Sequence, residues 1–542
     1  MNLTQALLQA LQARGATEVF GIPGDFALPL FLEMQKAGTL PLHPLSHEPA
    51  LAFAADAASR ARGGLGVAAV TYGAGALNLV NGVASAYAER VPLVILSGAP
   101  AAHEAASGLM LHHQVKSLDS QWRIFQEITV DQARLDDPRT APALIARVLD
   151  SALREAGPVY LEIPRDMPAR PCEPVPAPQA RPVDAERLAA CADELLARLR
   201  QARHPLMLVG VEIRRYGIEE QVAELARRLD IPVATTLMGR GLLHDAGVPL
   251  LGTYLGLAGD AALTEQVESS DGLLLLGAIL SDTNFAAARR PIDFRHGIRV
   301  WQGQVEMGHH SYHDVPIKDL VEALLLRLLT RPLRPAAPPH PWPAPLLPSA
   351  DAALSPGAII SVLNEFQQRH GAMPVASDVG DCLFSALDLA PGDLLAPGYY
   401  ASMGYGVPAG LGLQVATGRR PLILVGDGAF QMTGWELGNA RALGVDPIVV
   451  VFNNSSWEML RTFQPEGHYH GRGDWDFAAM AAGMGGTGHR AATVGELRMA
   501  LDQALQQRGR FQLIDARLPA GSLSPTLSRF VRAVKRLSMP ED

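Results

Sequence analysis

The segment that decides the fold opens with Pro421-Leu-Ile-Leu-Val-Gly-Asp-Gly428 and ends with Phe452-Asn-Asn454. It holds two apolar runs, 421–425 and 446–452, with helix-compatible sequence from Gln431 to Leu443 between them. We interpret it as strand, helix and strand, and the two strands lie parallel because the connection leaves room for a helical crossover. The polar residues after each run therefore meet at the carboxyl edge of the sheet, where open α/β sheets bind ligands.

Asp427 and Asn454 place a carboxylate and a carboxamide at this edge, beside glycines that let backbone approach a charged group closely. Such hard oxygen donors suit Mg²⁺, which keeps other bonds for phosphate and water. The turn contains no Arg or Lys, so the metal would carry the positive charge that holds a diphosphate. Gly-Asp-Gly alone is a common tight turn, whereas its pairing with Asn-Asn after a second apolar strand is far more specific.

This pair of motifs resembles the thiamin diphosphate (ThDP) binding motif of the 2-keto acid decarboxylase and acetohydroxyacid synthase family. The resemblance implies ThDP and Mg²⁺ as cofactors, with Asp427, Asn454 and the main-chain oxygen of Ser456 as metal ligands. It also implies that Gly428 and Ala429 contact the cofactor. Ser456 stands where the family usually has Gly, which matters little if only the carbonyl is used.

The composition is that of an ordinary globular protein, because the 542 residues are 48% apolar and 19% charged, with a net charge of −9. This mild acidity argues against a nucleic-acid or anionic-membrane surface. No apolar run reaches the ~18 residues of a membrane span, and the first residues show no secretory signal. Three scattered cysteines indicate neither a disulfide framework nor a zinc site. We expect a cytoplasmic protein with a small-molecule substrate.

Two proline-rich stretches, Met167 to Pro182 and Arg331 to Pro348, interrupt the alternation of helix-like and strand-like segments. Proline restricts the backbone and removes a donor, so both are expected to be extended linkers. They divide the chain into blocks 1–166, 183–330 and 349–542, each of about domain size. We predict an α/β fold with three doubly wound parallel-sheet domains, which by resemblance are pyrimidine-binding, central Rossmann-like and diphosphate-binding.

Apolar runs locate elements in the first two blocks. The first begins with a helical pattern from Leu3 to Gln12. In the middle block, the turn Gly210-Val-Glu-Ile-Arg-Arg215 is not a Gly-x-Gly-x-x-Gly turn, so a bound dinucleotide is not supported and we expect a scaffold. The predicted strands of these blocks are 18–21, 66–71 and 93–97, then 205–209, 231–235, 272–276 and 298–301.

Four polar residues of the first block form a pattern only when taken together. Asp25 follows a Pro-Gly turn, Glu48 precedes an apolar helix, and His112-His113 lies in a loop-like region. Singly they are explained as a turn residue, a helix N-terminal charge and exposed polar residues. Together they resemble the pyruvate and indolepyruvate type of 2-keto acid decarboxylase. The resemblance implies that Glu48 exchanges a proton with the ThDP aminopyrimidine, and that Asp25 and both histidines manage protons after CO₂ leaves.

Three further residues match family positions around the cofactor. Thr71, in Val70-Thr-Tyr-Gly-Ala-Gly75, should face it from a strand end. Met403, in Tyr400-Ala-Ser-Met-Gly404, should wedge ThDP into a bent shape, and the carbonyl of Ala401 should accept from its amino group. The bend brings the reacting groups of the cofactor together, which is catalysis by proximity. Ordinary core packing is the alternative explanation for Met403.

One departure from the pyruvate-type pattern concerns acid catalysis. Leu460 stands where those enzymes carry a catalytic Glu, six residues after Asn454. Glu458 is two residues earlier, and a helix would turn it to another side. Either the histidines suffice or another carboxyl replaces the missing one. Asp282, after Gly277-Ala-Ile-Leu-Ser281, is the candidate, and a strand-end turn residue is its alternative explanation.

A second departure concerns the substrate. Leu383 stands where pyruvate-specific relatives carry a Trp that shortens the pocket, so the leucine predicts space for an aromatic 2-keto acid. Met459, Leu460 and Phe463 would add apolar surface to the same pocket.

We therefore expect ThDP- and Mg²⁺-dependent decarboxylation of phenylpyruvate or indole-3-pyruvate to the aldehyde and CO₂. One alternative is a carboligase of the acetohydroxyacid synthase type, a branch that does not carry the His112-His113 pair. Another is a ThDP-binding regulatory protein without turnover, for which only the missing Glu argues. The resemblance also implies that Glu48 and Asp427 of one site come from different subunits, so that a homodimer is the minimum and a homotetramer is usual.

Overall fold

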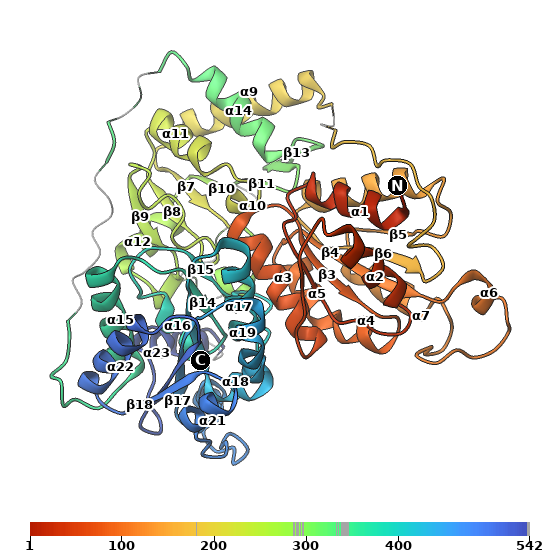
Figure 1. Ribbon diagram of the computed structural model, residues 1–542. Coiled ribbons are helices and arrows are strands. Elements are labelled where there is room, and N and C mark those ends of the chain that lie inside the picture. Colours follow the sequence, from red (N-terminus) through yellow and green to blue (C-terminus); the bar gives the residue numbers. More distant parts are fainter. Residues whose placement is uncertain are drawn as a thin grey trace.

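The computed structural model describes residues 1–538 apart from 180–181, 286–287, 289–291, 293, 295–296, 332, 334 and 338–345. Three sheets with their helices form three domains (Figure 1). Parts of both predicted proline-rich linkers, including 180–181 and 338–345, lie outside the described residues. The boundaries 1–166, 183–330 and 349–542 remain predictions. Over the described chain, no helix is both long enough and apolar enough to cross a bilayer.

The first sheet has six parallel strands in the described part of the chain, in the order β2–β1–β3–β4–β6–β5. Its strands are β1 Val19–Gly21, β2 Leu42–His43, β3 Gly66–Val70, β4 Leu93–Ala99, β5 Asp131–Arg134 and β6 Val159–Pro164. Its helices are α1 Leu3–Gln12, α2 Leu28–Ala37, α3 Glu48–Arg62, α4 Ala74–Asn78, α5 Val80–Ala88, α6 Ala102–Ala105, α7 Ser120–Ile128 and α8 Ala141–Glu155.

Both faces of this sheet are buried. Alternate residues of β3 enter different cores: Val67 and Ala69 pack in the one that includes α1, and Ala68 and Val70 in the one that includes α3. Helices on both faces are what a doubly wound parallel sheet requires. The predicted helix Leu3–Gln12 is confirmed with the same bounds. It begins there because the side chain of Asn2 accepts from the backbone N–H of Gln5 and so caps the N-terminus.

The third sheet repeats the topology of the first. Its described strands run in the order β15–β14–β16–β17–β19–β18, all parallel, which is the same order once strands are counted from the start of each domain. They are β14 Val375–Ser377, β15 Leu394–Leu395, β16 Leu422–Gly426, β17 Ile448–Asn453, β18 Thr487–Ala491 and β19 Gln512–Arg517. The helices are α15 Pro356–His370, α16 Asp381–Ala386, α17 Gly406–Thr417, α18 Asp427–Thr433, η2 Gly434–Asn439, α19 Ala440–Leu443, α20 Glu458–Phe463, α21 Phe477–Gly483, α22 Val494–Gln506 and α23 Pro525–Ser538.

The middle sheet is parallel except at one edge. Its order is β13–β12–β11–β10–β7–β8–β9, and β12 and β13 join by antiparallel pairing. Gln302 and Gly303 have positive φ, as a two-residue hairpin turn requires. The strands are β7 Pro205–Val209, β8 Val233–Thr235, β9 Leu250–Thr253, β10 Gly272–Leu276, β11 Ile298–Trp301, β12 Gln304–Met307 and β13 His310–His313. The helices are α9 Ala185–Gln201, α10 Glu212–Arg215, α11 Glu219–Leu229, η1 Gly256–Ala258, α12 Ala261–Glu268, α13 Asp282–Phe285 and α14 Ile317–Arg327.

The segment that decides the fold has the predicted topology. Strands β16 and β17 are parallel neighbours, with Gly426 opposite Phe452, so Asp427 and Asn454 both follow the same edge of the sheet. The helix begins at Asp427, four residues before the predicted Gln431, and a 3-10 segment interrupts it.

The first and third domains pack through α3 and α17. Gly412 of α17 lies so close to α3 that a Cβ there would stand 2.2 Å from the carbonyl oxygen of Ala54. Beside this contact, Arg60 is buried with the carboxylates of Asp56 and Glu89, at 2.5 and 2.8 Å. Because these charges are paired and hydrogen-bonded, their burial is tolerated. The contact fixes how the two domains sit within one chain.

Candidate active site

A cavity of about 510 Å³ opens beside the carboxyl ends of β16 and β17. Every residue that the sequence analysis assigned to the site from the middle and third blocks lines it. They are Asp282, Leu383, Ala401, Met403, Asp427, Gly428, Ala429, Asn454, Ser456, Met459, Leu460 and Phe463. We call the edge of the sheet that carries Asp427, Asn454 and Ser456 the metal edge. This metal edge and the predicted substrate pocket are parts of one cavity.

The metal edge of this cavity has a free buried oxygen. Asp427 is only 3% exposed, and its Oδ1 accepts from the backbone N–H of Gly428 at 2.7 Å. Its Oδ2 is buried without a hydrogen-bond partner among the described residues. Burial raises the pKa of Asp427 to about 6 against several backbone donors. A carboxylate oxygen left unpaired at this depth, next to the carboxamide of Asn454, fits a divalent cation, so the donor set agrees with the predicted Mg²⁺ ligands.

Gly428 is required by the close approach of Trp457. A Cβ at position 428 would stand 2.4 Å from Nε1 of that tryptophan. The Trp457 Nε1 is itself buried without a partner in the part of the chain that the structure describes. Any side chain at this turn would push the indole away, so the packing of Trp457 alone requires a glycine at this position of the motif.

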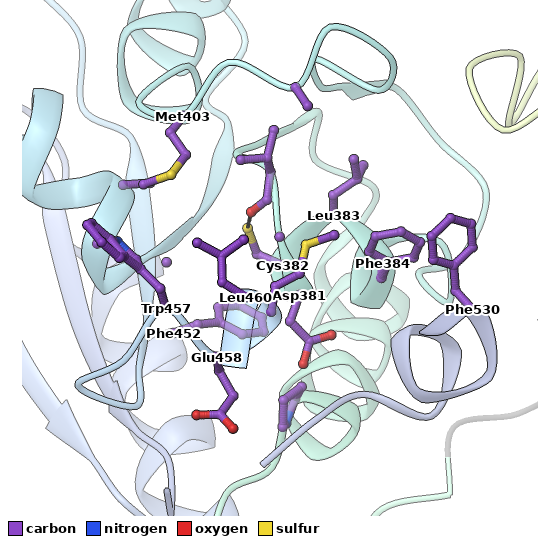
Figure 2. Close-up of a pocket in the computed structure, with 18 of the residues that line it drawn as sticks. Asp381, Cys382, Leu383, Phe384, Met403, Phe452, Trp457, Glu458, Leu460 and Phe530 are labelled. Carbon is purple, nitrogen blue, oxygen red and sulfur yellow. Dashed lines mark hydrogen bonds between the residues drawn. The ribbon is translucent and has the colours of Figure 1, made fainter. Parts of the chain in front are cut away.

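Ala401 and Met403 lie on the segment that leads into α17. Ala401 has φ of +59°, a left-handed conformation that costs a residue with a Cβ free energy. Met403 packs against the core shared by the first and third domains, and Figure 2 shows it projecting into the cavity. Both residues therefore lie at the cavity, and their roles towards ThDP remain predictions.

The wall of the cavity around the predicted substrate pocket is apolar, and two domains contribute to it. Leu383 and Phe384 of α16 are each 6% exposed. The ring of Phe384 meets that of Phe530 of α23 at 4.8 Å between centroids (Figure 2). Leu237 of the middle domain completes this wall. The middle domain thus contributes Leu237 to the cavity in addition to Asp282, the one residue of this block that we had carried as a site candidate.

Three of these wall residues were not found from the sequence. Neither Leu237 nor Phe384 belongs to a motif with a known role, and Leu237 reaches the cavity only through contacts between the middle and third domains. Phe530 lies on a strongly amphipathic C-terminal helix. That amphipathic pattern was the one available signal, and it predicts a buried face without saying what the face covers.

Several carboxyl groups line the cavity, and they differ in their partners. Asp381 accepts from the backbone N–H of Ser524 at 2.8 Å. Glu458 is buried beside Arg461, 3.5 Å away, and Figure 2 shows its carboxylate directed away from Leu460. Asp282, at the start of α13, is exposed and accepts from the N–H of Thr283 at 2.7 Å. Asp282 is therefore the carboxyl that remains most accessible from solvent.

A second cluster lies in the first domain. Nε2 of His112 is hydrogen-bonded to Asp25, and Nε2 of His113 lies 3.5 Å from the same carboxylate. The ring of Phe26 stacks on His112 at 4.7 Å between centroids. Partial burial acts to raise the pKa of Asp25, but the hydrogen bond and charge of His112 outweigh it and hold that pKa below its usual value. The structure thus brings Asp25 and both histidines together, as the resemblance implied.

Glu48 and Thr71 lie at neighbouring strand and helix ends of the same domain. Glu48 is the first residue of α3 and accepts from Nδ2 of Asn78 at 3.0 Å. The hydroxyl of Thr71 is buried and has no partner among the described residues. A buried hydroxyl left free beside a half-buried carboxyl is a suitable place for a polar ligand. This fits the predicted contact with ThDP.

The two clusters do not share one cavity within a single chain. Among the described residues, those that line the cavity begin at Leu237, so none comes from the first domain. Asp25, Glu48, Thr71, His112 and His113 therefore stand apart from Asp427 and the substrate wall.

Comparisons with known proteins also place a cofactor-binding domain at each end of the matched region. The family model described as "Thiamine pyrophosphate enzyme, N-terminal TPP binding domain" matches residues 1–123. The models for the central domain and the C-terminal TPP binding domain of the same enzymes match residues 192–328 and 378–516.

Curated relatives cover nearly the whole chain. A protein from Azospirillum brasilense named indole-3-pyruvate decarboxylase is 58% identical over 542 residues, which is 99% of each chain. An alpha-keto-acid decarboxylase of Mycobacterium ulcerans is 29% identical, over 99% of this chain and 96% of its own length. Pyruvate decarboxylase isozyme 1 of Saccharomyces cerevisiae is 26% identical, over 96% of each chain. The chain belongs to the family of thiamin diphosphate-dependent 2-keto acid decarboxylases.

Proposed function

We propose that this enzyme catalyses the non-oxidative decarboxylation of an aromatic 2-keto acid, phenylpyruvate or indole-3-pyruvate, to the aldehyde and CO₂. The observation that carries the proposal is the single cavity that joins the metal edge at Asp427 to an apolar wall of Leu383, Phe384 and Phe530. A cofactor-binding edge continuous with an aromatic pocket suits a substrate with an acid group at one end and a ring at the other. The relative from Azospirillum brasilense is named for such a substrate.

The residues of the chain divide the work of this reaction. Asp427, Asn454 and the main-chain oxygen of Ser456 would hold Mg²⁺, which would supply the positive charge for a diphosphate. Bound ThDP supplies a carbon nucleophile and a positively charged ring that accepts the electrons left by CO₂. Glu48 would exchange a proton with the aminopyrimidine of bound ThDP, and Asp25, His112 and His113 would move protons at the substrate after decarboxylation. These residue roles are part of the proposal.

The division of the site into two clusters supports a second proposal, that a complete site needs two copies of the chain. Glu48 and the histidine cluster face no part of the cavity of their own chain. A symmetric dimer would place the first domain of one copy against the cavity of the other, twice. We propose a homodimer as the minimal unit, with a tetramer as a pair of dimers.

Product analysis separates this function from its alternatives. The enzyme with ThDP and Mg²⁺ is expected to convert phenylpyruvate to phenylacetaldehyde and CO₂ in equal amounts. Acetolactate from pyruvate without aldehyde would instead favour the carboligase. Binding of ThDP with neither product would favour the regulatory protein.

Leu383→Trp is expected to shorten the pocket. The variant should lose about 10- to 100-fold in kcat/KM for phenylpyruvate and keep its kcat/KM for pyruvate, because a filled pocket discriminates by size with roughly 1–3 kcal/mol. Steady-state kinetics on both acids measure the change. Leu383→Met, which conserves volume, is the matched control. Equal losses on both acids would remove Leu383 from the pocket assignment.

Asp282→Asn tests whether this carboxyl replaces the acid missing at Leu460. We expect kcat to fall by about 100-fold, the range of general acid–base catalysis, with little change in the Kd for ThDP. Asp245→Asn is the control, since its side chain is 88% exposed in the same domain. An unaltered kcat in Asp282→Asn would return the residue to the role of a turn residue.

A further inference from the structure

Gln121, near the start of α7, is a buried polar residue with every polar group of its side chain in use. It is 1% exposed. Its Oε1 accepts from the backbone N–H of Gly73 at 2.6 Å. Its Nε2 donates to Oγ of Ser97 at 3.0 Å and to the hydroxyl of Tyr160 at 2.5 Å. A buried carboxamide with this many partners can hold only one orientation.

A chain of polar groups fixes Gln121 from the outside. The hydroxyl of Tyr160 donates to Glu162 Oε2 at 2.8 Å. Nε of Arg134 donates to the other oxygen of Glu162 at 2.6 Å, and its Nη2 donates to Asp119 at 2.7 Å. Burial raises the pKa of Glu162, while the guanidinium of Arg134 favours its charged form. Gln121, Tyr160 and Glu162 are the buried members of this network, and buried polar groups whose hydrogen bonds are satisfied are held rigidly.

The turn at Gly73, which Gln121 holds, contacts residues next to two proposed catalytic groups of the first domain, His113 and Glu48. Gly73 has φ of +66°, and a Cβ there would stand 2.1 Å from the carbonyl oxygen of His113. His113 itself has φ of +64°, an uncommon conformation for a non-glycine residue. The same turn opens α4, whose last residue, Asn78, donates to Glu48. A movement of the turn would therefore shift the backbone of His113 and the hydrogen-bond partner of Glu48.

We propose that Gln121 is a positioning residue that holds the Gly73 turn, and with it His113 and Glu48, in the arrangement that the reaction needs. This inference rests on the proposed function, because those two residues matter only if it is right. Gln121 acts through the N–H of Gly73. Its loss leaves that N–H buried without a partner, which the turn can relieve only by moving.

The test compares variants of two buried residues at opposite ends of α7, Gln121 near its start and Thr129 directly after its last residue, in the full chain with ThDP and Mg²⁺. Gln121→Met keeps the volume and removes all three hydrogen bonds. Thr129→Val is the control, because the Thr129 hydroxyl is also buried and donates only to the carbonyl of Phe125, at 2.7 Å, away from the turn. Three quantities are measured for each: Tm, kcat against KM for phenylpyruvate, and the NMR signals of ring-labelled His112 and His113.

We expect Gln121→Met to lower kcat about 10-fold or more with little change in KM, since small misplacements of catalytic groups are costly. The signals of His113 should move in this variant and stay in place in Thr129→Val. Unmoved histidine signals in Gln121→Met, or equal losses of kcat in both variants at equal Tm, would overturn the inference.

A milder variant keeps the inference falsifiable if Gln121→Met does not fold. Tyr160→Phe removes one partner of Gln121 and retains the Gly73 bond, so a smaller movement of the His113 signal and a smaller loss of kcat are expected. No movement at all would contradict the proposed relay. If the wild-type enzyme releases no aldehyde, the proposed function fails, while the NMR comparison still reports whether Gln121 sets the geometry of the turn.

Discussion

Glu48→Gln is expected to bind ThDP and Mg²⁺ normally and to lose about 1,000-fold in the rate of proton exchange at the reactive thiazolium carbon. The substitution keeps the size of the side chain and its hydrogen-bonding capacity towards Asn78. It removes the carboxyl that exchanges a proton with the aminopyrimidine, a general acid–base contribution of roughly 10²–10⁴-fold. Exchange is followed by quenched hydrogen–deuterium exchange and NMR of the cofactor.

The control for Glu48→Gln is Glu127→Gln, a carboxyl exposed on α7 of the same domain. It should exchange at the wild-type rate. Normal exchange in Glu48→Gln would contradict the assignment of Glu48, whatever happened to overall turnover.

The Asp427→Asn variant is expected to lose affinity for ThDP as well as catalytic activity. The Oδ2 of Asp427 is buried and unpaired in the described structure, so we expect the metal to be its partner. Since losing a residue that merely supports a metal ligand costs 10–100-fold in affinity, losing the ligand itself should weaken Mg²⁺-dependent ThDP binding by more than about 100-fold. Titration calorimetry measures this. Asp474→Asn, whose side chain is 74% exposed in the same domain, is the control, and unchanged ThDP affinity in Asp427→Asn would contradict the metal assignment.

Glu48→Gln and Asp427→Asn together test whether Glu48 and Asp427 of one active site come from different subunits. In a mixed dimer of Glu48→Gln and Asp427→Asn chains, one site carries both defects and the other carries none. Random mixing by co-expression should therefore restore about a quarter of wild-type turnover, although each variant alone is inactive. No recovery would place Glu48 and Asp427 of each site in the same chain.

The fold was predictable where strands are continuous and apolar. The runs 205–209 and 272–276 coincide with β7 and β10, because strands buried on both faces of a parallel sheet have no alternating polar side. The run 298–301 also coincides with β11, although its burial alternates. The hairpin strands β12 and β13 were missed for the converse reason. Their residues Gln304–Met307 and His310–His313 are largely polar, and they pair at an open edge.

The site was predictable where one motif supplies all the groups. Asp427 and Asn454 follow neighbouring strands, so their meeting is dictated by local sequence and by the direction of the strands. Leu237, Phe530 and Gln121 could not be found in this way. Each becomes informative only through a partner far along the chain, such as Phe384 for Phe530 or Gly73 for Gln121.

The most direct measurement is kcat/KM for aldehyde release from phenylpyruvate, indole-3-pyruvate and pyruvate, each with and without ThDP and Mg²⁺. We predict turnover of the aromatic acids only with the cofactors present, at least about tenfold better than pyruvate, in keeping with an open apolar pocket at Leu383. Preference for pyruvate would contradict the pocket assignment. No aldehyde from any of the three acids, with ThDP bound, would contradict the decarboxylase itself.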